Sequence, residues 1–126
     1  MLILDSGAVS RLSERSSRTA ALIQALRGQG LWPPVVPSVV LAECLTGDGS
    51  RDAAALRFLR TCDVHEQVPV QLARRAASLR FRARHGSAVD AIVTASAEPG
   101  GTVLTGDTED LQALAGYAYD VAVERI

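Results

Sequence analysis

Lysine is absent from this 126-residue sequence, and all 13 of its lysine or arginine positions carry arginine. Mechanisms that form a Schiff base need a lysine amine, and the phosphate-binding P-loop also needs a lysine. The phosphoacceptor site of receiver domains, an acidic pocket on an α/β sheet, uses one as well. The lack of lysine therefore excludes three functions that are common among α/β proteins.

Cysteine is scarce, and long apolar runs are missing. Cys44 and Cys62 do not match a metal-binding spacing. Both lie in apolar stretches that we expect to be helical, which favours buried thiols over a disulfide. The apolar runs are too short to span a bilayer, and each is interrupted by charge or proline. No basic and apolar leader precedes the first expected strand, so we expect a cytoplasmic protein with no membrane association.

The overall composition indicates one globular domain. Apolar residues make up 48% of the chain and charged residues 21%, with a net charge of −1. These proportions are typical of folded rather than disordered chains. The length is sufficient to bury a core without disulfides or metals, and there is no internal repeat and no long linker. We expect a single domain over residues 1–126.

Two apolar strands are each followed at once by a hydroxyl and an acid. Residues 1–4 form an apolar run that leads into Asp5 and Ser6, with Gly7 to turn the chain. Val103 and Leu104 form a second run, which ends in Thr105-Gly106-Asp107. Parallel strands place their carboxyl ends at one edge of the sheet, where ligands bind in open α/β folds. We expect both acids at that edge.

The remaining patterns predict a parallel sheet covered by helices on both faces. A strand framed by prolines is expected at 32–37, residues 63–68 fit either a strand or a loop, and the alternation of Tyr117, Tyr119, Val121 and Val123 predicts a last strand. Helices are expected near 8–12, 20–26, 39–45 with Ser38 as N-cap, 51–61, 70–84 with Gly86 closing it, and 88–97.

Four acids are candidates for chemistry, and each has a structural alternative. Asp5 and Asp107 are placed to cap the helices that follow them, and Asp107 with Asp110 has the spacing of a capping box. Glu43 lies in an apolar helix, where it is either on the surface or partly buried. Asp90 follows a serine by three residues, which is again a capping-box spacing, and it opens an almost wholly apolar helix.

A divalent cation would explain why four acids converge. Carboxylates gathered in one cleft raise each other's pKa unless a cation neutralises them. Hard ions such as Mg²⁺ prefer oxygen ligands and keep several waters. His65 and His85 stand apart from one another and from the cysteines, so there is no case for zinc.

Taken in register, these motifs resemble the PIN domain, and within it the VapC-type toxins of bacterial toxin–antitoxin pairs. The resemblance extends over essentially the whole chain. It is carried by four motifs: Asp5-Ser6 after the first strand, Glu43 after the second, Asp90 in the segment 87–93, and Thr105-Gly106-Asp107-Thr108-Glu109-Asp110. One departure is Leu111, where the family often has an aromatic residue, and it affects packing behind the site.

The resemblance implies a three-layer α/β/α sandwich around a mainly parallel sheet and an endoribonuclease that depends on Mg²⁺ or Mn²⁺. The acidic residues would be Asp5, Glu43, Asp90 and Asp107, with Ser6 and Thr105 as supporting hydroxyls and Asp110 as an optional further ligand. It also implies a homodimer and a cognate antitoxin that blocks the acidic cleft.

The mechanism that we predict is metal-assisted hydrolysis of RNA phosphodiesters. Asp5, Asp90 and Asp107 would hold one or two cations, and Glu43 would ligate metal or position the attacking water. An acidic cleft repels RNA, so arginines must lie nearby. The candidates are Arg11 and Arg15 after the first strand, and Arg74, Arg75, Arg80, Arg82 and Arg84 on the long helix. For any one of them, a solvated helix face is the alternative.

Two other functions compete with the nuclease. A phosphatase of the haloacid dehalogenase type also starts from an aspartate after the first strand, but it needs a second acid two residues later, where this chain has Gly7. The missing lysine counts against it too. The other alternative is a catalytically inactive PIN-like module that binds RNA or protein.

Overall fold

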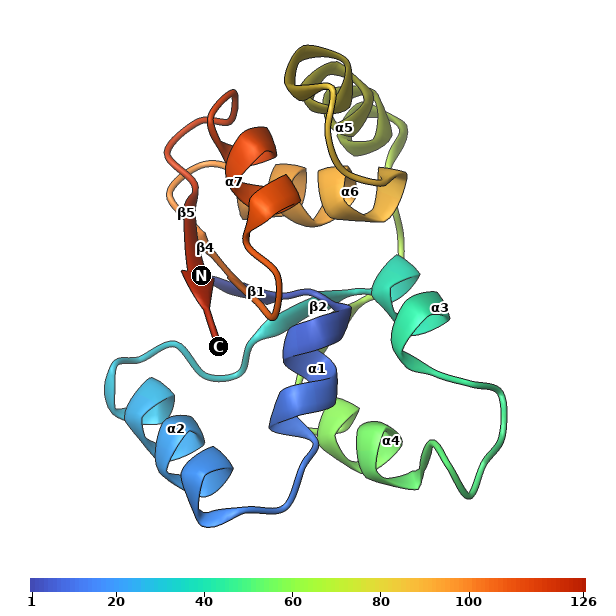
Figure 1. Cartoon of the computed structure of the whole chain (residues 1–126), viewed down its shortest axis with the longest axis vertical. Coiled ribbons are helices and arrows are strands. Elements are labelled where there is room, and N and C mark those ends of the chain that lie inside the picture. Colours follow the sequence, from blue (N-terminus) through green and yellow to red (C-terminus); the bar gives the residue numbers. More distant parts are fainter.

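The computed structural model describes residues 1–126, and its centre is a five-stranded sheet (Figure 1). The strand order is β3-β2-β1-β4-β5, and every neighbouring pair is parallel. Ile3 of the central strand pairs with Val35 on one side and Val103 on the other. The strands are β1 (Leu2–Leu4), β2 (Val35–Pro37), β3 (Asp63–His65), β4 (Thr102–Thr105) and β5 (Ala122–Arg125).

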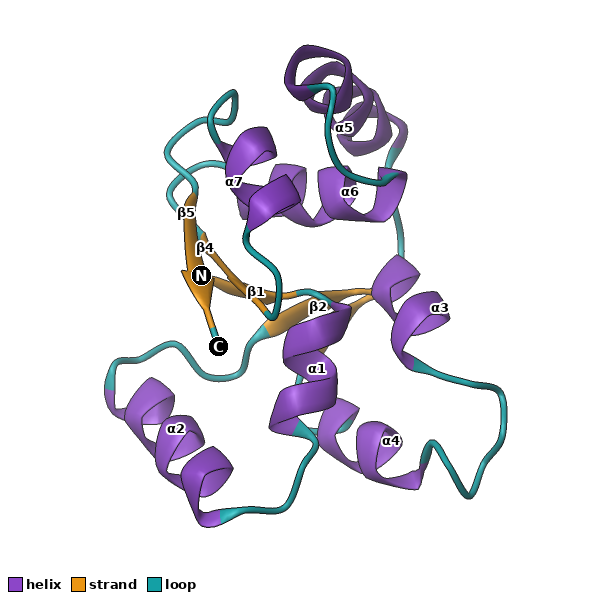
Figure 2. Ribbon diagram, viewed as in Figure 1, coloured by secondary structure: helices purple, strands orange, loops and turns teal.

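Helices cover both faces of this sheet, as predicted. Figure 2 shows α5, α6 and α7 on one side of the strands, and α1, α2 and α4 on the other. The helices are α1 (Ser6–Leu12), α2 (Ser17–Gly28), the 3₁₀ turn η1 (Ser38–Val40), α3 (Leu41–Cys44), α4 (Ala53–Leu59), α5 (Val70–Ala83), α6 (Ala88–Ala97) and α7 (Glu109–Ala115). The three-layer α/β/α sandwich is therefore confirmed. None of these helices is long and apolar enough to cross a membrane.

The core lies where the inner strands meet α6. Ile3, Leu4 and Val103 are at most 5% exposed, as expected for parallel strands that are covered on both faces. Val93 of α6 is fully buried against them, which explains why this helix has almost no polar face. All of these side chains belong to one continuous apolar cluster, and that cluster holds the strand ends in fixed positions.

The sheet has one topological switch point. The chain runs outward from β1 to β2 and β3, and then returns to the other side of β1 to form β4 and β5. Connections therefore leave the carboxyl ends of β1 and β4 in opposite directions. In open α/β sheets, the crevice outside such a pair of strand ends is where ligands bind.

The last strand differs from the prediction. β5 begins at Ala122, whereas Tyr117 and Tyr119 precede it in a turn and are 51% and 70% exposed. Asp120 has a φ of 52°, a left-handed conformation that interrupts extended chain between the tyrosines and the strand. The alternation of aromatic residues was misleading because Tyr119 packs beneath the guanidinium of Arg75 rather than in the sheet.

Two predicted helix ends were also wrong. Ser38 does not cap a helix: it starts η1, and its hydroxyl donates to the carbonyl of Glu66, 2.9 Å away. The helix predicted at 70–84 ends at Ala83, and its left-handed C-cap is Arg84, with a φ of 53°, rather than Gly86. Residues 63–68, which were ambiguous, form β3 over their first three positions.

The two cysteines are free, as expected, but only half-buried. Cys44 is the last residue of α3, and Cys62 lies beyond the end of α4 rather than in a helix. Burial raises the pKa of the Cys62 thiol to about 11, and that of Cys44 is raised for the same reason. Both thiols are therefore protonated at neutral pH and poorly reactive.

Candidate active site at the switch point

Asp5 follows β1 and has both carboxylate oxygens bonded. Oδ1 accepts the Ala8 backbone N–H at 2.8 Å, so Asp5 is the N-cap of α1, and Oδ2 accepts the Thr105 hydroxyl. Desolvation by burial raises the pKa of Asp5, and the nearby charge of Asp90 acts in the same direction, although the two hydrogen bonds oppose the shift. Asp5 is therefore both the N-cap of α1 and a residue of the candidate site.

Thr105 joins the ends of β1 and β4. It is fully buried, and its Oγ1 accepts the Asp107 N–H at 3.0 Å while also lying 2.8 Å from the Asp107 carbonyl. A hydroxyl has only one proton, so the carboxylate of Asp5 and the carbonyl of Asp107 compete for it. An ionised carboxylate is the stronger acceptor, and it holds the proton whenever Asp5 is charged.

Two glycines allow the first turn of α1 and the turn after β4 to lie in contact. A Cβ on Gly7 would lie 3.2 Å from the backbone nitrogen of Gly106 and 3.5 Å from Oδ1 of Asp5. Gly7 is a helical residue of α1 rather than a turn residue, so the prediction for it was wrong. Its signal in the sequence was the poor fit of glycine to a helix, which indicates a close approach.

Asp90 is held by a capping box at the start of α6. The Ser87 hydroxyl accepts the Asp90 N–H at 3.1 Å, and Oδ2 of Asp90 accepts the Ser87 N–H at 3.0 Å. The capping prediction is therefore confirmed. The charge of the same carboxylate is one of the lesser causes of the raised pKa of Asp5, after desolvation by burial.

The other predicted acids are further out. Asp107 is exposed, and its Oδ1 accepts the Glu109 N–H at 3.2 Å instead of forming a box with Asp110. Asp110 is half-exposed and lies 3.4 Å from Nδ1 of His85. Glu43 is exposed on α3, which settles the choice between surface and partial burial. The Ser6 hydroxyl makes none of the hydrogen bonds that fix these carboxylates.

The structure thus fixes two of the four carboxylates, Asp5 and Asp90, by hydrogen bonds and leaves the other two exposed. No three histidine, cysteine, aspartate or glutamate side chains are grouped so that they could hold a metal ion. Mg²⁺ is, however, commonly bound by one or two carboxylates together with waters. Asp5 and Asp90, which their hydrogen bonds hold in fixed orientations, offer the hard oxygen donors that such an ion prefers.

The arginines fall into two groups. Arg75 makes a bidentate ion pair with Glu98 at 2.8 Å, and Nε of Arg80 donates to the Gly86 carbonyl at 3.3 Å, so both are engaged in the fold. The other predicted candidates are exposed and form no ion pair: Arg11, Arg15, Arg74, Arg82 and Arg84.

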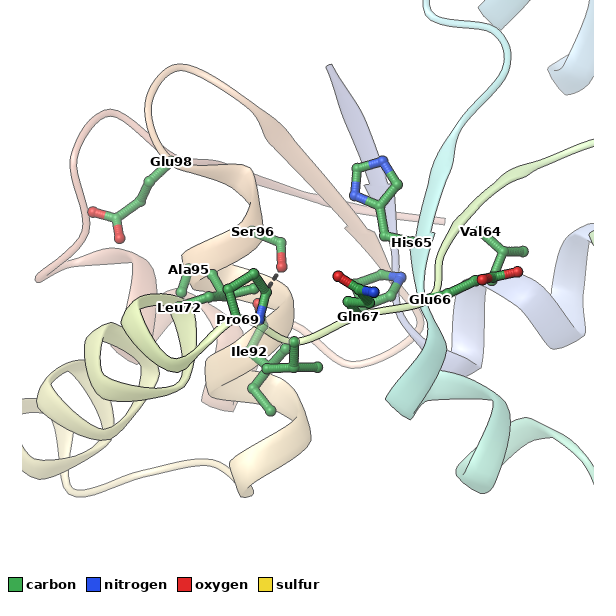
Figure 3. A pocket seen from close by; sticks show the side chains of 12 residues that line it. Val64, His65, Glu66, Gln67, Pro69, Leu72, Ile92, Ala95, Ser96 and Glu98 are labelled. Atoms are coloured by element: carbon green, nitrogen blue, oxygen red, sulfur yellow. Dashed lines mark hydrogen bonds between the residues drawn. The ribbon is translucent and has the colours of Figure 1, made fainter.

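A cavity of about 660 Å³ lies elsewhere, between the segment after β3 and α6 (Figure 3). His65, Gln67 and Leu72 line it, together with Ser96, whose hydroxyl donates to the Ile92 carbonyl at 2.7 Å. None of the four predicted acids lines this cavity. The volume of this cavity therefore does not identify the candidate site, which is identified by its place at the switch point of the sheet and by its acidic residues.

The three-layer fold and the acids at its switch point agree with the comparison to known proteins. The family model of the PIN domain matches residues 2–117. The chain therefore belongs to the PIN-domain family, whose members are generally nucleases. Among solved structures it is similar to FitAcB from Neisseria gonorrhoeae, with 21% identity, coverage of 98% of this chain and 96% of that one, and a TM-score of 0.63. No curated protein sequence matches it.

Proposed function

We propose that the chain is an endoribonuclease that depends on Mg²⁺ or Mn²⁺ and hydrolyses RNA phosphodiester bonds. The observation that carries this proposal is Asp5, a carboxylate that two neutral donors hold at the end of β1, beside the switch point of a PIN-domain sheet. Ligands bind at this place in open α/β sheets, and carboxylates attract a divalent cation.

In this proposal, Asp5, Asp90 and Asp107 hold the cation, directly or through water. When bound, such an ion would supply an activated water and would neutralise charge on the phosphodiester. The chain's own contribution is orientation. The Ala8 N–H and the Thr105 hydroxyl fix Asp5, and the capping box fixes Asp90, so that neither carboxylate has to be ordered when the cation binds.

The rim residues have supporting roles. Glu43, which is free and exposed on α3, positions the attacking water or adds a ligand. Asp110 is available as an outer ligand, and Ser6 lies beside Asp5 as a second hydroxyl. Arg11 and Arg15 on one flank, with the α5 arginines 82 and 84 on the other, offset the repulsion between RNA and the acids.

We further propose that the whole chain is one PIN domain and acts in the cytoplasm as the toxin of a type II toxin–antitoxin pair. The four motifs resemble VapC-type toxins, and a homodimer and a cognate antitoxin follow from that resemblance. Val70 and Phe81 on α5 are 69% and 79% exposed, so apolar area is available for a protein partner.

One observation favours a second candidate, a PIN-like module that binds RNA or protein without cleaving it. Three acids are not grouped as a ready metal site. A titration with Mg²⁺ or Mn²⁺, followed by thermal shift, separates the two functions. A competent site raises the unfolding temperature as the metal saturates it, whereas an inactive module shows no change.

The deciding experiment is RNA cleavage by the purified chain with Mg²⁺ or Mn²⁺, beside EDTA and beside an Asp90→Asn variant. Glu109→Gln is a matched control, because it removes an exposed acid two residues beyond Asp107 that we place outside the site. Cleavage that needs metal, is lost in Asp90→Asn and persists in Glu109→Gln supports the proposal. Cleavage that survives Asp90→Asn contradicts it.

A further inference from the structure

A second feature lies beside the carboxylates, on the α1 side of the sheet. It is a cleft of about 500 Å³ between the end of α1, the start of α2 and Ile126. Arg11 and Arg18 line it from the two helices, and Ser16 and Thr19 add two hydroxyls. We call this feature the arginine cleft.

The arginine cleft is connected directly to the site. Ile126, which forms one of its walls, donates its backbone N–H to the carbonyl of Thr105 at 2.9 Å. Thr105 is the residue whose hydroxyl holds the carboxylate of Asp5. Ile126, at one wall of the cleft, and Thr105, which supports the carboxylate of Asp5, are thus neighbours where β4 pairs with β5.

The helix geometry of α1 points Arg11 toward the same place. Arg11 follows Gly7 by four residues, so both project from one face of α1, about 6 Å apart along the axis. Gly7 abuts Gly106 in the turn after β4. Arg11 is therefore the next side chain along the face that borders the site.

The charge of the cleft suits an anion. Arg11 and Arg18 are both exposed and have no carboxylate partner, unlike Arg75. Glu14 is the one acidic side chain that lines the cleft, so the side chains of the cleft carry a net charge of +1. Guanidinium groups bind phosphate oxygens through paired hydrogen bonds. The Ser16 hydroxyl already donates to Thr19 at 3.1 Å, so the Thr19 hydroxyl is the neutral donor of the cleft.

We propose that the arginine cleft binds a phosphate of the RNA backbone next to the phosphodiester that is cleaved. This inference rests on the proposed nuclease function and deepens it. It places the path of the substrate over α1, from the carboxylates at the strand ends toward the start of α2. Recognition there involves phosphate only, so it adds affinity and alignment without base specificity.

The test is the salt dependence of RNA affinity, measured by fluorescence anisotropy with a labelled 16-nucleotide RNA of random sequence in EDTA. The unaltered chain is compared with Arg11→Gln/Arg18→Gln and with the control Arg51→Gln/Arg60→Gln, which removes two exposed arginines at the ends of α4. Removing one arginine that binds a phosphate reduces the slope of log K against log salt by roughly 0.7. Affinity at 0.1 M salt should then fall about 5- to 25-fold in the cleft variant and stay unchanged in the control.

Glu14→Gln provides a change of opposite sign. Removing the only acidic side chain of the cleft should tighten RNA binding about 2- to 5-fold, which damage to the fold would not do. A cleft variant with the same slope as the control overturns the assignment. So does competition by a polyglutamate peptide at equal charge, because the cleft would then recognise carboxylates of a protein.

Cleavage assays on the same samples separate this inference from the proposed function. RNA cleavage by the unaltered chain, together with an unchanged slope in the cleft variant, overturns the cleft and leaves the nuclease standing. Failure of the unaltered chain to bind any RNA overturns both. Cleavage together with a reduced slope confirms that the cleft contacts the substrate.

Discussion

Asp5 and Glu98 are two carboxylates that each join distant parts of the chain, yet their surroundings are opposite. Glu98 receives both arms of the Arg75 guanidinium and the Tyr119 N–H, and the hydrogen bonds from Arg75 lower its pKa. Asp5 receives only neutral donors and faces a second acid, and burial raises its pKa. The fold supplies a cation to one carboxylate and withholds it from the other.

This difference separates a structural acid from a candidate ligand. Glu98 is complete within the fold, because its charge is neutralised and it ties α5 to the turn before β5. Asp5 is oriented but not neutralised. A group that is fixed in place and lacks a counter-ion is disposed to bind one from solution. The predictions below test this contrast, from the largest expected effect to the smallest.

The largest effect should come from Asp5→Asn. We expect RNA cleavage to fall at least 100-fold, because an amide is a poor metal ligand and cannot replace the carboxylate. The fold should survive, since the amide oxygen can still accept the Ala8 N–H and the amide nitrogen can donate to Thr105. Initial rates with Mg²⁺ measure the effect, and undiminished cleavage would remove Asp5 from the site.

The same variant gives a pH test. Because the pKa of Asp5 is raised in the folded state above its ordinary value of 3.8, the fold favours the protonated acid. Asp5 therefore contributes stability below that value and loses this contribution as the pH rises through its folded pKa. At pH 7 without metal, Asp5→Asn should melt at a higher temperature than the unaltered chain, with the gap closing toward pH 3. If Asp5→Asn melted at a lower temperature than the unaltered chain at pH 7, the contrast between Asp5 and Glu98 would be refuted.

Arg75→Met should destabilise the fold by about 2 kcal/mol. It leaves Glu98, which is 9% exposed, without its cation, while the 28% exposure of Arg75 keeps the loss below that of a fully buried pair. Chemical denaturation at pH 7 measures the change. Because the lowered pKa of Glu98 adds stability above its ordinary value of 4.5, the penalty should shrink as the pH falls below that value. Adding Glu98→Gln should restore part of the loss, and a penalty independent of pH would contradict this account.

Thr105→Val tests the hydroxyl group that orients the carboxylate of Asp5. Valine keeps the shape of threonine but removes the hydroxyl shared by Asp5 and Asp107, so the part-buried hydrogen bond from the Asp107 N–H is lost. We expect stability to fall by about 1–2 kcal/mol and cleavage to fall 10- to 100-fold. Thr105→Ser should recover most of both. Full activity in the valine variant would show that the hydroxyl does not orient the carboxylate.

Gly7→Ala should have the smallest effect. The added Cβ meets the Gly106 nitrogen at 3.2 Å, so the turn after β4 must give way by a few tenths of an ångström. Alanine also favours the helix by up to about 1 kcal/mol, which offsets the strain. We expect nearly unchanged stability and cleavage reduced about 2- to 5-fold. Complete loss of cleavage without any change in stability would show how finely the two turns must fit.

The order of elements and the layers of the fold could be predicted from sequence. Short, wholly apolar runs such as 1–4 and 103–104 are typical of strands that are covered on both faces in a parallel sheet. The break between α1 and α2 at Ser16 and the capping box of Asp90 were equally readable from local spacing. Long-range partners were not readable. No local sequence pattern shows that Arg75 pairs with Glu98, or that Tyr119 packs against Arg75 instead of belonging to a strand.

For the site, sequence could name the acids at the strand ends but could not measure how closely they meet. Strand register places Asp5 beside Thr105, and a resemblance to known motifs gives their roles. Whether Glu43 is buried, or Asp107 turns inward, depends on side-chain packing around turns. These acids are exposed at the rim, where no packed side chain fixes their positions.

The hydrogen bond between Thr105 and Asp5 joins residues that are 100 positions apart, so the site can assemble only late in synthesis of the chain. A ribosome makes Asp5 long before Thr105, and β1 has no β4 beside it until residues 102–105 have been synthesised. Pairing across such a span is slow, since the chain must close a loop of this length before the two strands meet. A growing chain that stops short of β4 therefore has no assembled site. Any activity of this protein begins only after that strand has left the ribosome and paired with β1.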